Sequence, residues 1–222
     1  MRKFKDFLQD INIVESLQHG EGYQEAGELM GQKDPDIMAF IAKIGIPHKP
    51  PGSHWSDEDD NYAINLGKII DSIPSNATIE PNQIPNLKNL ANKPGQEQLP
   101  QQLSQISGQP DAAQKYIDFM QKRDSGEGRN RGYNVADLVK KVQSGDYSPP
   151  VLIKGGSGLV VVGGRTRLYA ALALGIPIKV KVLDENIKQK MPQQQTPQVQ
   201  VASTIYDKPI LNEWLILSGL LK

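Results

Sequence analysis

The stretch VVVGGRTRLYAALALGIPIKVKVL, residues 160–183, combines signals for a strand, a turn and a helix. A run of valines leads into the pair Gly163–Gly164, and an alanine-rich segment over 166–174 follows at once. That segment ends at Gly175, a common residue just beyond the end of a helix. A second β-type run occupies 178–183. The stretch therefore predicts a strand, a tight turn, a helix and another strand.

The turn has the composition of a phosphate site. Gly163 and Gly164 let the backbone turn sharply and bring amide N–H groups near a ligand. The first N–H groups of the next helix are unpaired and lie at the positive end of its dipole, which suits phosphate. Arg165 and Arg167 add planar guanidinium groups for bidentate contacts, and Thr166 can cap the helix or donate to an oxygen. We predict that these five residues bind phosphate.

The same turn has a purely structural interpretation. Its spacing matches neither a Walker loop, which requires Gly-Lys-Ser/Thr, nor a dinucleotide fingerprint with three spaced glycines. A tight connection from strand to helix, followed by surface arginines, would use the same residue types. Both interpretations are open on these residues alone.

Two further β-type runs precede the turn, at 151–154 and 159–162, with a hairpin turn between them. In the last run, 178–183, isoleucine and valine alternate with Lys179 and Lys181, which predicts that one face of the sheet is exposed to solvent. Helices are expected before the hairpin, at 111–123 and from an Asn134 cap to about 143, with a loop over 126–134.

The rest of the chain predicts helices separated by polar segments. Apolar spacing and caps favour helices at 2–18, at 35–44, and after Ser56, where Asp57, Glu58 and Asp59 suit the helix dipole. An apolar helix is expected at 208–221. We predict an α+β protein with four parts: a helical N-terminal region (1–92), a Gln/Pro-rich linker (93–110), a small mixed domain (111–187), and a polar linker with a C-terminal helix (188–222).

Residues 137–183, DLVKKVQSGDYSPPVLIKGGSGLVVVGGRTRLYAALALGIPIKVKVL, resemble the core of the ParB/sulfiredoxin-like superfamily. Domains of that superfamily have a helix, a glycine turn, a proline-led strand and a hairpin. A Gly-x-x-Arg helix start, small residues and a final strand follow. The resemblance implies this fold for 111–187 and implies nucleotide binding. Members include CTP-hydrolysing DNA-segregation clamps, ATP-using sulfinic acid reductases, free-serine kinases and proposed nucleases.

By position, the resemblance aligns Gly164 and Arg167 with the family glycine and arginine that contact nucleotide phosphates, and Ala170 with a small residue after them. Arg165 departs from the pattern, since segregation clamps usually have glutamate there and sulfiredoxins have the reactive cysteine. The chain has no cysteine, which argues against sulfinic acid reduction. The Asp-Gly-His-His-Arg sequence of the kinase-like members has its aspartate and histidines replaced here by Gly163, Arg165 and Thr166.

Two acidic residues are candidates for catalysis. A carboxylate near bound phosphates can coordinate Mg²⁺ or act as a base, and the related kinases place a glutamate upstream of the first strand. Glu127, in RDSGEGRNRG, and Asp146, just before the first strand, occupy such positions. An ordinary loop acid is the alternative for each. The cofactor implied is a nucleoside triphosphate, ATP or CTP, with Mg²⁺ where a carboxylate holds it.

No metal site is predicted from the histidines. His48 and His54 flank a proline-glycine turn beside several acids, but their spacing fits no familiar ligand pattern. The acids that follow are explained by their place at a helix N-terminus.

Charge and composition limit the partners. The chain has 25 basic and 25 acidic residues, yet residues 121–183 carry 11 Lys and Arg against 4 Asp and Glu. This local excess favours an anionic ligand, a nucleotide first and DNA second, with protein partners for the helical regions. No apolar run approaches the ~20 residues that span a bilayer. We expect a cytoplasmic protein, or one in a host cytoplasm or virion, since the opening MRKFKDFL resembles those of tailed-phage proteins.

The function expected from these features is nucleotide binding through phosphate, as a nucleotide-dependent phosphotransferase or an NTP hydrolase. The alternatives are a non-catalytic nucleotide- or DNA-binding module, a nuclease, and a structural or accessory phage protein. The residues themselves leave open whether the chain is an enzyme.

Overall fold

The structure is a computed structural model, and it describes residues 21–50, 52–91, 96–127, 134–156 and 158–190. The helices predicted at 2–18 and 208–221 and the polar tract after residue 190 lie outside these ranges. In chain order the elements are α2 (Glu21–Gly31), α3 (Pro35–Ile44), α4 (Asp57–Ser72), β1 (Ala77–Ile79), η1 (Pro81–Asn86), α5 (Leu99–Ile106), α6 (Ala112–Glu127), α7 (Val135–Ser144), β2 (Val151–Gly155), β3 (Gly158–Gly163), α8 (Arg165–Leu174), β4 (Ile178–Leu183) and η2 (Glu185–Lys190).

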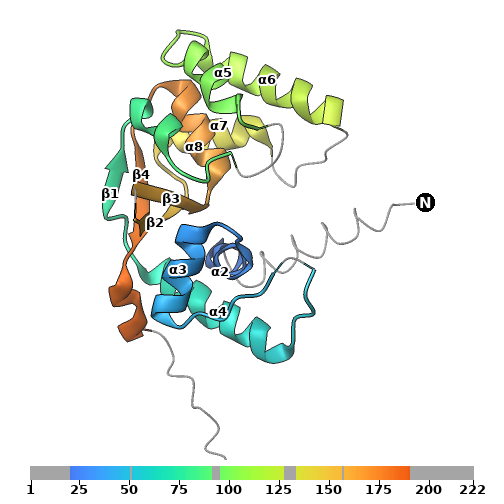
Figure 1. Cartoon of the computed structure of the whole chain (residues 1–222). Helices are drawn as coiled ribbons and strands as arrows, with labels where there is room; N and C mark the ends of the chain where they lie inside the picture. The colour runs from blue at the N-terminus through green and yellow to red at the C-terminus, as the bar shows by residue number, and fades with distance from the viewer. Residues whose placement is uncertain (1–20, 51, 92–95, 128–133, 157, 191–222) are drawn as a thin grey trace, which may run out of the picture. The chain divides into compact units, whose positions relative to one another are not determined.

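The four described strands form one mixed sheet in the order β1-β4-β2-β3, and the α+β class is confirmed (Figure 1). β2 and β3 form the predicted antiparallel hairpin. α8 then carries the chain from β3 past β2, so that β4 pairs with β2 in parallel. β1 adds an antiparallel edge to β4. The start of α8 therefore follows directly from an edge strand of the sheet.

Helices cover both faces of this sheet (Figure 1). Leu152 and Val161 belong to the core cluster that contains residues of α5, α6, α7 and α8. Ile153 and Val162 belong to a second cluster, which contains residues of α2, α3 and α4. Successive residues of a strand point to opposite faces, so β2 and β3 each contribute to both clusters.

The prediction of one solvent-exposed face for β4 is wrong. Lys179 is exposed, but Lys181 is 5% exposed because α2, α3 and α4 cover that face. The Lys181 ammonium donates to the carbonyl oxygens of Ile70 at 2.9 Å and Asp71 at 3.4 Å. These carbonyls lie at the C-terminal end of α4, whose last turn has no basic residue of its own. Lys181 thus supplies from the sheet the cation that a helix C-terminus favours.

The division at 93–110 is also corrected. α5 lies inside the segment predicted as a linker, and its Leu99 and Leu103 are buried in the core cluster beneath α8. Two leucines at helical spacing bury one face of α5 while the glutamines keep the other face polar. The N-terminal region is not separate either. β1 belongs to the sheet, Lys88 pairs with Val160 of β3, and the described residues fall into one compact unit.

The capping signals predicted for α3, α4 and α7 are confirmed. α3 starts at Pro35 and is followed by Gly45 in the left-handed conformation, with φ of 81°. α4 follows Ser56, whose hydroxyl accepts a hydrogen bond from the Asp59 N–H while the Asp59 side chain accepts one from the Ser56 N–H. Asn134 caps α7 as expected. These signals act over a few residues and need no tertiary context.

α2 and α4 cross at a glycine-to-glycine contact. A Cβ atom added to Gly67 would lie 2.6 Å from the backbone nitrogen of Tyr23 and 2.7 Å from the carbonyl carbon of Gly22. A Cβ atom added to Gly22 would lie 2.3 Å from the carbonyl oxygen of Gly67. The two helix backbones are therefore as close as the absence of side chains permits, and this contact fixes α2 on α4.

We predict that Gly67→Ala destabilises the protein by about 1–3 kcal/mol or more, because the new methyl group meets backbone that cannot yield. Urea unfolding of the full-length protein measures the effect. The matched control is Gly27→Ala in α2, where the added Cβ would meet only Trp55 at 4.0 Å. Gly27→Ala should be neutral or stabilising by up to about 1 kcal/mol through helix propensity. Equal stability of the two variants would contradict the close contact.

Asp59 links the start of α4 to the loop before it. Its carboxylate accepts hydrogen bonds from Lys49 at 2.6 Å, from the Ser56 backbone at 2.9 Å and from the Ser56 hydroxyl at 2.9 Å. The bond from Lys49 and then the one from the Ser56 backbone lower the pKa of Asp59 from 3.8 to about 2. A carboxylate whose pKa is lower in the folded than in the unfolded protein stabilises the fold at pH values above its unfolded pKa. This stabilisation is lost as the pH falls through the pKa of the folded state.

Asp59→Asn should therefore lower the melting temperature at pH 7, and the gap between wild type and variant should narrow as the pH falls from 3.8 towards 2. Thermal unfolding between pH 7 and pH 3 follows the trend. Asp57→Asn, which removes an exposed acid from the same first turn, is the control for the helix dipole. A gap that stays constant over this pH range would rule out the assigned role of Asp59.

Candidate functional site

The turn between β3 and α8 depends on Gly164. This residue caps α8 with φ of 77°, a left-handed conformation that favours glycine. A Cβ atom at Gly164 would also lie 2.7 Å from the Cα atom of Pro150. Both constraints require glycine, and neither involves a ligand.

The first turn of α8 closes on the Gly164 carbonyl. That oxygen accepts hydrogen bonds from the N–H of Arg167 at 3.0 Å and of Leu168 at 3.3 Å. The helix begins at Arg165, one residue earlier than predicted, so Gly164 rather than Thr166 is its N-cap and there is no side-chain cap. Arg165 and Thr166 occupy the first two helical positions, whose N–H groups have no acceptor within a helix.

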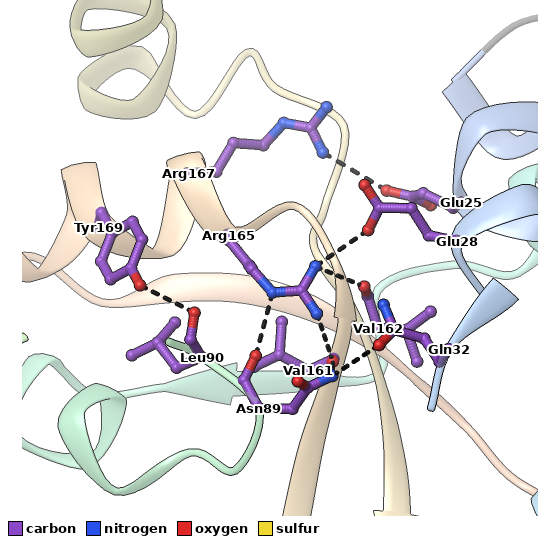
Figure 2. A network of polar contacts seen from close by, with 10 residues as sticks. All are labelled: Glu25, Glu28, Gln32, Asn89, Leu90, Val161, Val162, Arg165, Arg167 and Tyr169. Carbon is purple, nitrogen blue, oxygen red and sulfur yellow. Dashed lines mark hydrogen bonds and ion pairs between the residues drawn. The ribbon is translucent and has the colours of Figure 1, made fainter. Parts of the chain in front are cut away.

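The Arg165 side chain is directed into the protein (Figure 2). Its Nε donates to the Asn89 carbonyl at 3.0 Å. Its two terminal nitrogens donate to the Val162 carbonyl at 2.9 Å, the Val161 carbonyl at 3.1 Å and the Glu28 carboxylate at 3.0 Å. These bonds occupy four of the five N–H groups of a guanidinium. The side chain is 11% exposed, so Arg165 anchors the start of α8 and has little capacity left for phosphate.

The burial of Arg165 has an electrostatic cost that Glu28 offsets. Burial lowers the pKa of Arg165, and the charge and hydrogen bond of Glu28 act in the opposite direction. Arginine stays ionised under such shifts, because its ordinary pKa lies far above neutral pH. The pair therefore holds α2 against the end of β3.

Asn89 completes this arrangement from the loop after η1. It adopts a left-handed backbone conformation, with φ of 56°, which asparagine tolerates better than most residues. Its side-chain nitrogen donates to the Val161 carbonyl at 2.9 Å and to the Gln32 side chain at 3.3 Å. Because its own carbonyl accepts from Arg165, Asn89 links the loop, β3 and the end of α2.

Arg167 faces a second carboxylate of α2. Its terminal nitrogen lies 3.5 Å from a carboxylate oxygen of Glu25, and the two side chains are 17% and 6% exposed. Glu25 and Glu28 are three residues apart and share one face of the helix. Figure 2 shows both carboxylates directed towards the two arginines. The site thus contains two guanidinium groups and two carboxylates at the positive end of α8.

Gly163 provides the space for these carboxylates. A Cβ atom at this position would lie 3.0 Å from Cγ of Glu25 and 3.5 Å from a carboxylate oxygen of Glu28. The structure therefore explains Gly163 by its contact with α2. The turn does have the surroundings of an anion site, and the anions beside it here belong to the chain itself.

The two acids predicted as catalytic, Glu127 and Asp146, have no described contact with the start of α8. Glu127 is the last residue of α6 and does not lie in a loop, and its side chain is outside what the structure describes. Asp146 is exposed just after the Gly145 cap of α7, where its N–H donates to the Lys141 carbonyl at 3.0 Å. Within the described residues, no hydrogen bond or ion pair joins the Asp146 carboxylate to the start of α8.

Glu25, Glu28 and Asn89 were not predicted from the sequence. Glu28 lies 137 residues from Arg165, and Asn89 lies 76 residues from it. The spacing of the two glutamates on one helical face was visible, but nothing in it indicates a partner in α8. Only the folded arrangement brings these residues together.

Within the described ranges, no group of three or more His, Asp or Glu side chains is arranged to hold a metal ion. His48 instead contacts the Gln32 carbonyl at 2.9 Å. In the same ranges no helix combines the length and apolarity needed to cross a membrane. Comparisons with protein-family models, curated proteins and solved structures find no match.

We predict that Arg165→Ala lowers the free energy of unfolding by about 2–3 kcal/mol, because it leaves buried acceptors and Glu28 without their donor. This expected loss of stability is at the low end for breaking a buried ion pair, since the Glu28 side chain is 36% exposed. Arg165→Lys should restore only part of the loss, because an ammonium cannot reproduce the planar fork. Urea unfolding measures all three proteins. Wild-type stability in Arg165→Ala would show that the network is not an anchor.

Proposed function

We propose that the protein binds a nucleoside triphosphate, ATP or CTP, through its phosphates at the start of α8. The activity proposed is nucleotide-dependent phosphotransfer or NTP hydrolysis. The observation that carries the proposal is the convergence of Arg167 and two carboxylates of α2 on a helix N-terminus. Cationic donors for phosphate and acids for metal or proton chemistry are the components that phosphoryl transfer requires.

The phosphate contacts are assigned to the first turn of α8. The N–H groups of Arg165 and Thr166 occupy the positions at which helices bind anions. Arg167 supplies a guanidinium from the third position, and the Thr166 hydroxyl is a further donor. The Arg165 side chain takes no part in this assignment, because its hydrogen bonds hold the turn in place.

Glu25 and Glu28 are the first candidates for acid chemistry in this proposal. Mg²⁺ in nucleotide sites is commonly bound by one or two carboxylates together with phosphate oxygens, and a carboxylate near the phosphates can also act as a base. Both glutamates lie beside Gly163, whereas within the described residues the Asp146 carboxylate has no hydrogen bond or ion pair to the start of α8. Glu127 and Asp146 stay as secondary candidates.

The order of elements also supports the proposal. The resemblance to the ParB/sulfiredoxin-like superfamily predicts a helix, a hairpin, a helix start with Gly-x-x-Arg, and a final strand. α7, β2, β3, α8 and β4 follow each other in that order. Gly164 and Arg167, the two residues that the resemblance aligns with phosphate contacts, are the N-cap of α8 and its third residue.

A non-catalytic, nucleotide-responsive module is the second candidate. It is favoured by the ion pair between Glu25 and Arg167, which engages an acid that catalysis would otherwise use. Turnover separates the two functions. An enzyme should release or transfer phosphate and lose that activity in Glu28→Gln, while a binding module should bind nucleotide without turnover.

The decisive test is calorimetric titration of the full-length protein with ATP, CTP, GTP and UTP, each with Mg²⁺. One nucleotide should bind, and Arg167→Ala should weaken its binding at least about tenfold, as expected for loss of a charge-assisted hydrogen bond. The matched control is Lys68→Ala, which removes an exposed cation from α4 and should bind as wild type does. A thermal melt verifies that each variant is folded.

Two results would count against the proposal. If none of the four nucleotides binds, the protein is not a free-nucleotide enzyme, and a DNA or protein partner becomes the better hypothesis. If Arg167→Ala and Lys68→Ala bind equally well, the nucleotide binds elsewhere.

A further inference from the structure

The position assigned to phosphate is already next to an anion of the chain. The Glu25 carboxylate contacts Arg167, packs on Gly163 and is 6% exposed. Carboxylate and phosphate oxygens are both acceptors for a guanidinium, and both are favoured at the positive end of a helix. A phosphate added to this arrangement would meet two negative charges at short range.

The two ion pairs between α2 and α8 differ in length. Glu28 lies 3.0 Å from an arginine that is itself fixed to two carbonyls of β3 and one of the loop. Glu25 lies 3.5 Å from Arg167, which is beyond a good hydrogen bond. Glu25 therefore has the longer contact with its arginine, while Glu28 keeps α2 in place.

We propose that Glu25 is an internal competitor of the phosphate ligand. The carboxylate occupies Arg167 in the ligand-free protein, and a phosphate binds there only when Glu25 moves away. The contact of α2 with β3 thereby regulates access to the start of α8. This inference rests on the proposed function, since it concerns the same phosphate contacts.

The test uses inorganic tripolyphosphate without divalent cations, because a metal ion could bridge the carboxylate and the phosphate. Calorimetry compares full-length wild type with Glu25→Gln, which keeps the shape of the side chain and removes its charge. The variant should bind tripolyphosphate at least tenfold more tightly than wild type. Glu58→Gln, the same change at an exposed position of α4, should bind as wild type does.

A local competition differs from a general charge effect in its response to salt. At about 1 M salt the Debye length is only ~3 Å, so long-range repulsion between Glu25 and the ligand is screened. The ratio of the two affinities should persist at this salt concentration if Glu25 competes for Arg167. A ratio that falls to one would overturn the proposal.

A second variant tests the same contact without changing any charge. Gly163→Ala places a Cβ atom 3.0 Å from Cγ of Glu25 and should displace the carboxylate from Arg167. It should also tighten tripolyphosphate binding, and it replaces Glu25→Gln if that variant does not fold. If the folded variants bind tripolyphosphate as wild type does, or more weakly, the competition is overturned. The proposed function still stands in that case if wild type binds a nucleotide with Mg²⁺. Loss of all binding, with and without Mg²⁺, would overturn both.

Discussion

The buried guanidinium of Arg165 is the interaction on which the rest of this arrangement depends. It joins segments that are far apart in the sequence, namely the end of β3, the loop at Asn89 and helix α2. Burying an arginine is costly unless its donors are satisfied, and here backbone carbonyls and one carboxylate accept four hydrogen bonds. The direction in which α8 leaves the sheet follows from this anchor together with the left-handed Gly164.

The charges around α8 then follow from its sequence. A helix N-terminus favours anions, yet the first and third residues of α8 are arginines. Glu28 and Glu25 compensate this excess of positive charge by forming ion pairs with Arg165 and Arg167, respectively. The N-terminal helices are therefore more than a cover for the sheet, because they supply the negative charge that the start of α8 requires.

Local elements were predictable from the sequence because their signals act over a few residues. The Ser56–Asp59 capping box, the Gly45 and Gly175 helix ends and the glycine turn before α8 each depend on neighbouring positions. α5 was missed because its glutamines outnumber the two leucines that bury it. The burial of Lys181 was missed because alternation along a strand does not reveal that a helix layer covers the polar face. For the same reason no pattern in α2 could identify its partners in α8.

The pair Gly163–Gly164 shows that a motif typical of a phosphate site can have a purely structural cause. Gly163 and Gly164 suggested close approach of a phosphate, but contacts with Glu25 and Pro150 and a positive φ account for both glycines. Arg167 and the positive end of α8, not the glycines, are therefore the features that favour a ligand. The chain already places the Glu25 carboxylate at Arg167. Whether phosphate binds therefore depends on the difference in free energy between the contact of Arg167 with phosphate and its contact with Glu25, rather than on the strength of either contact alone.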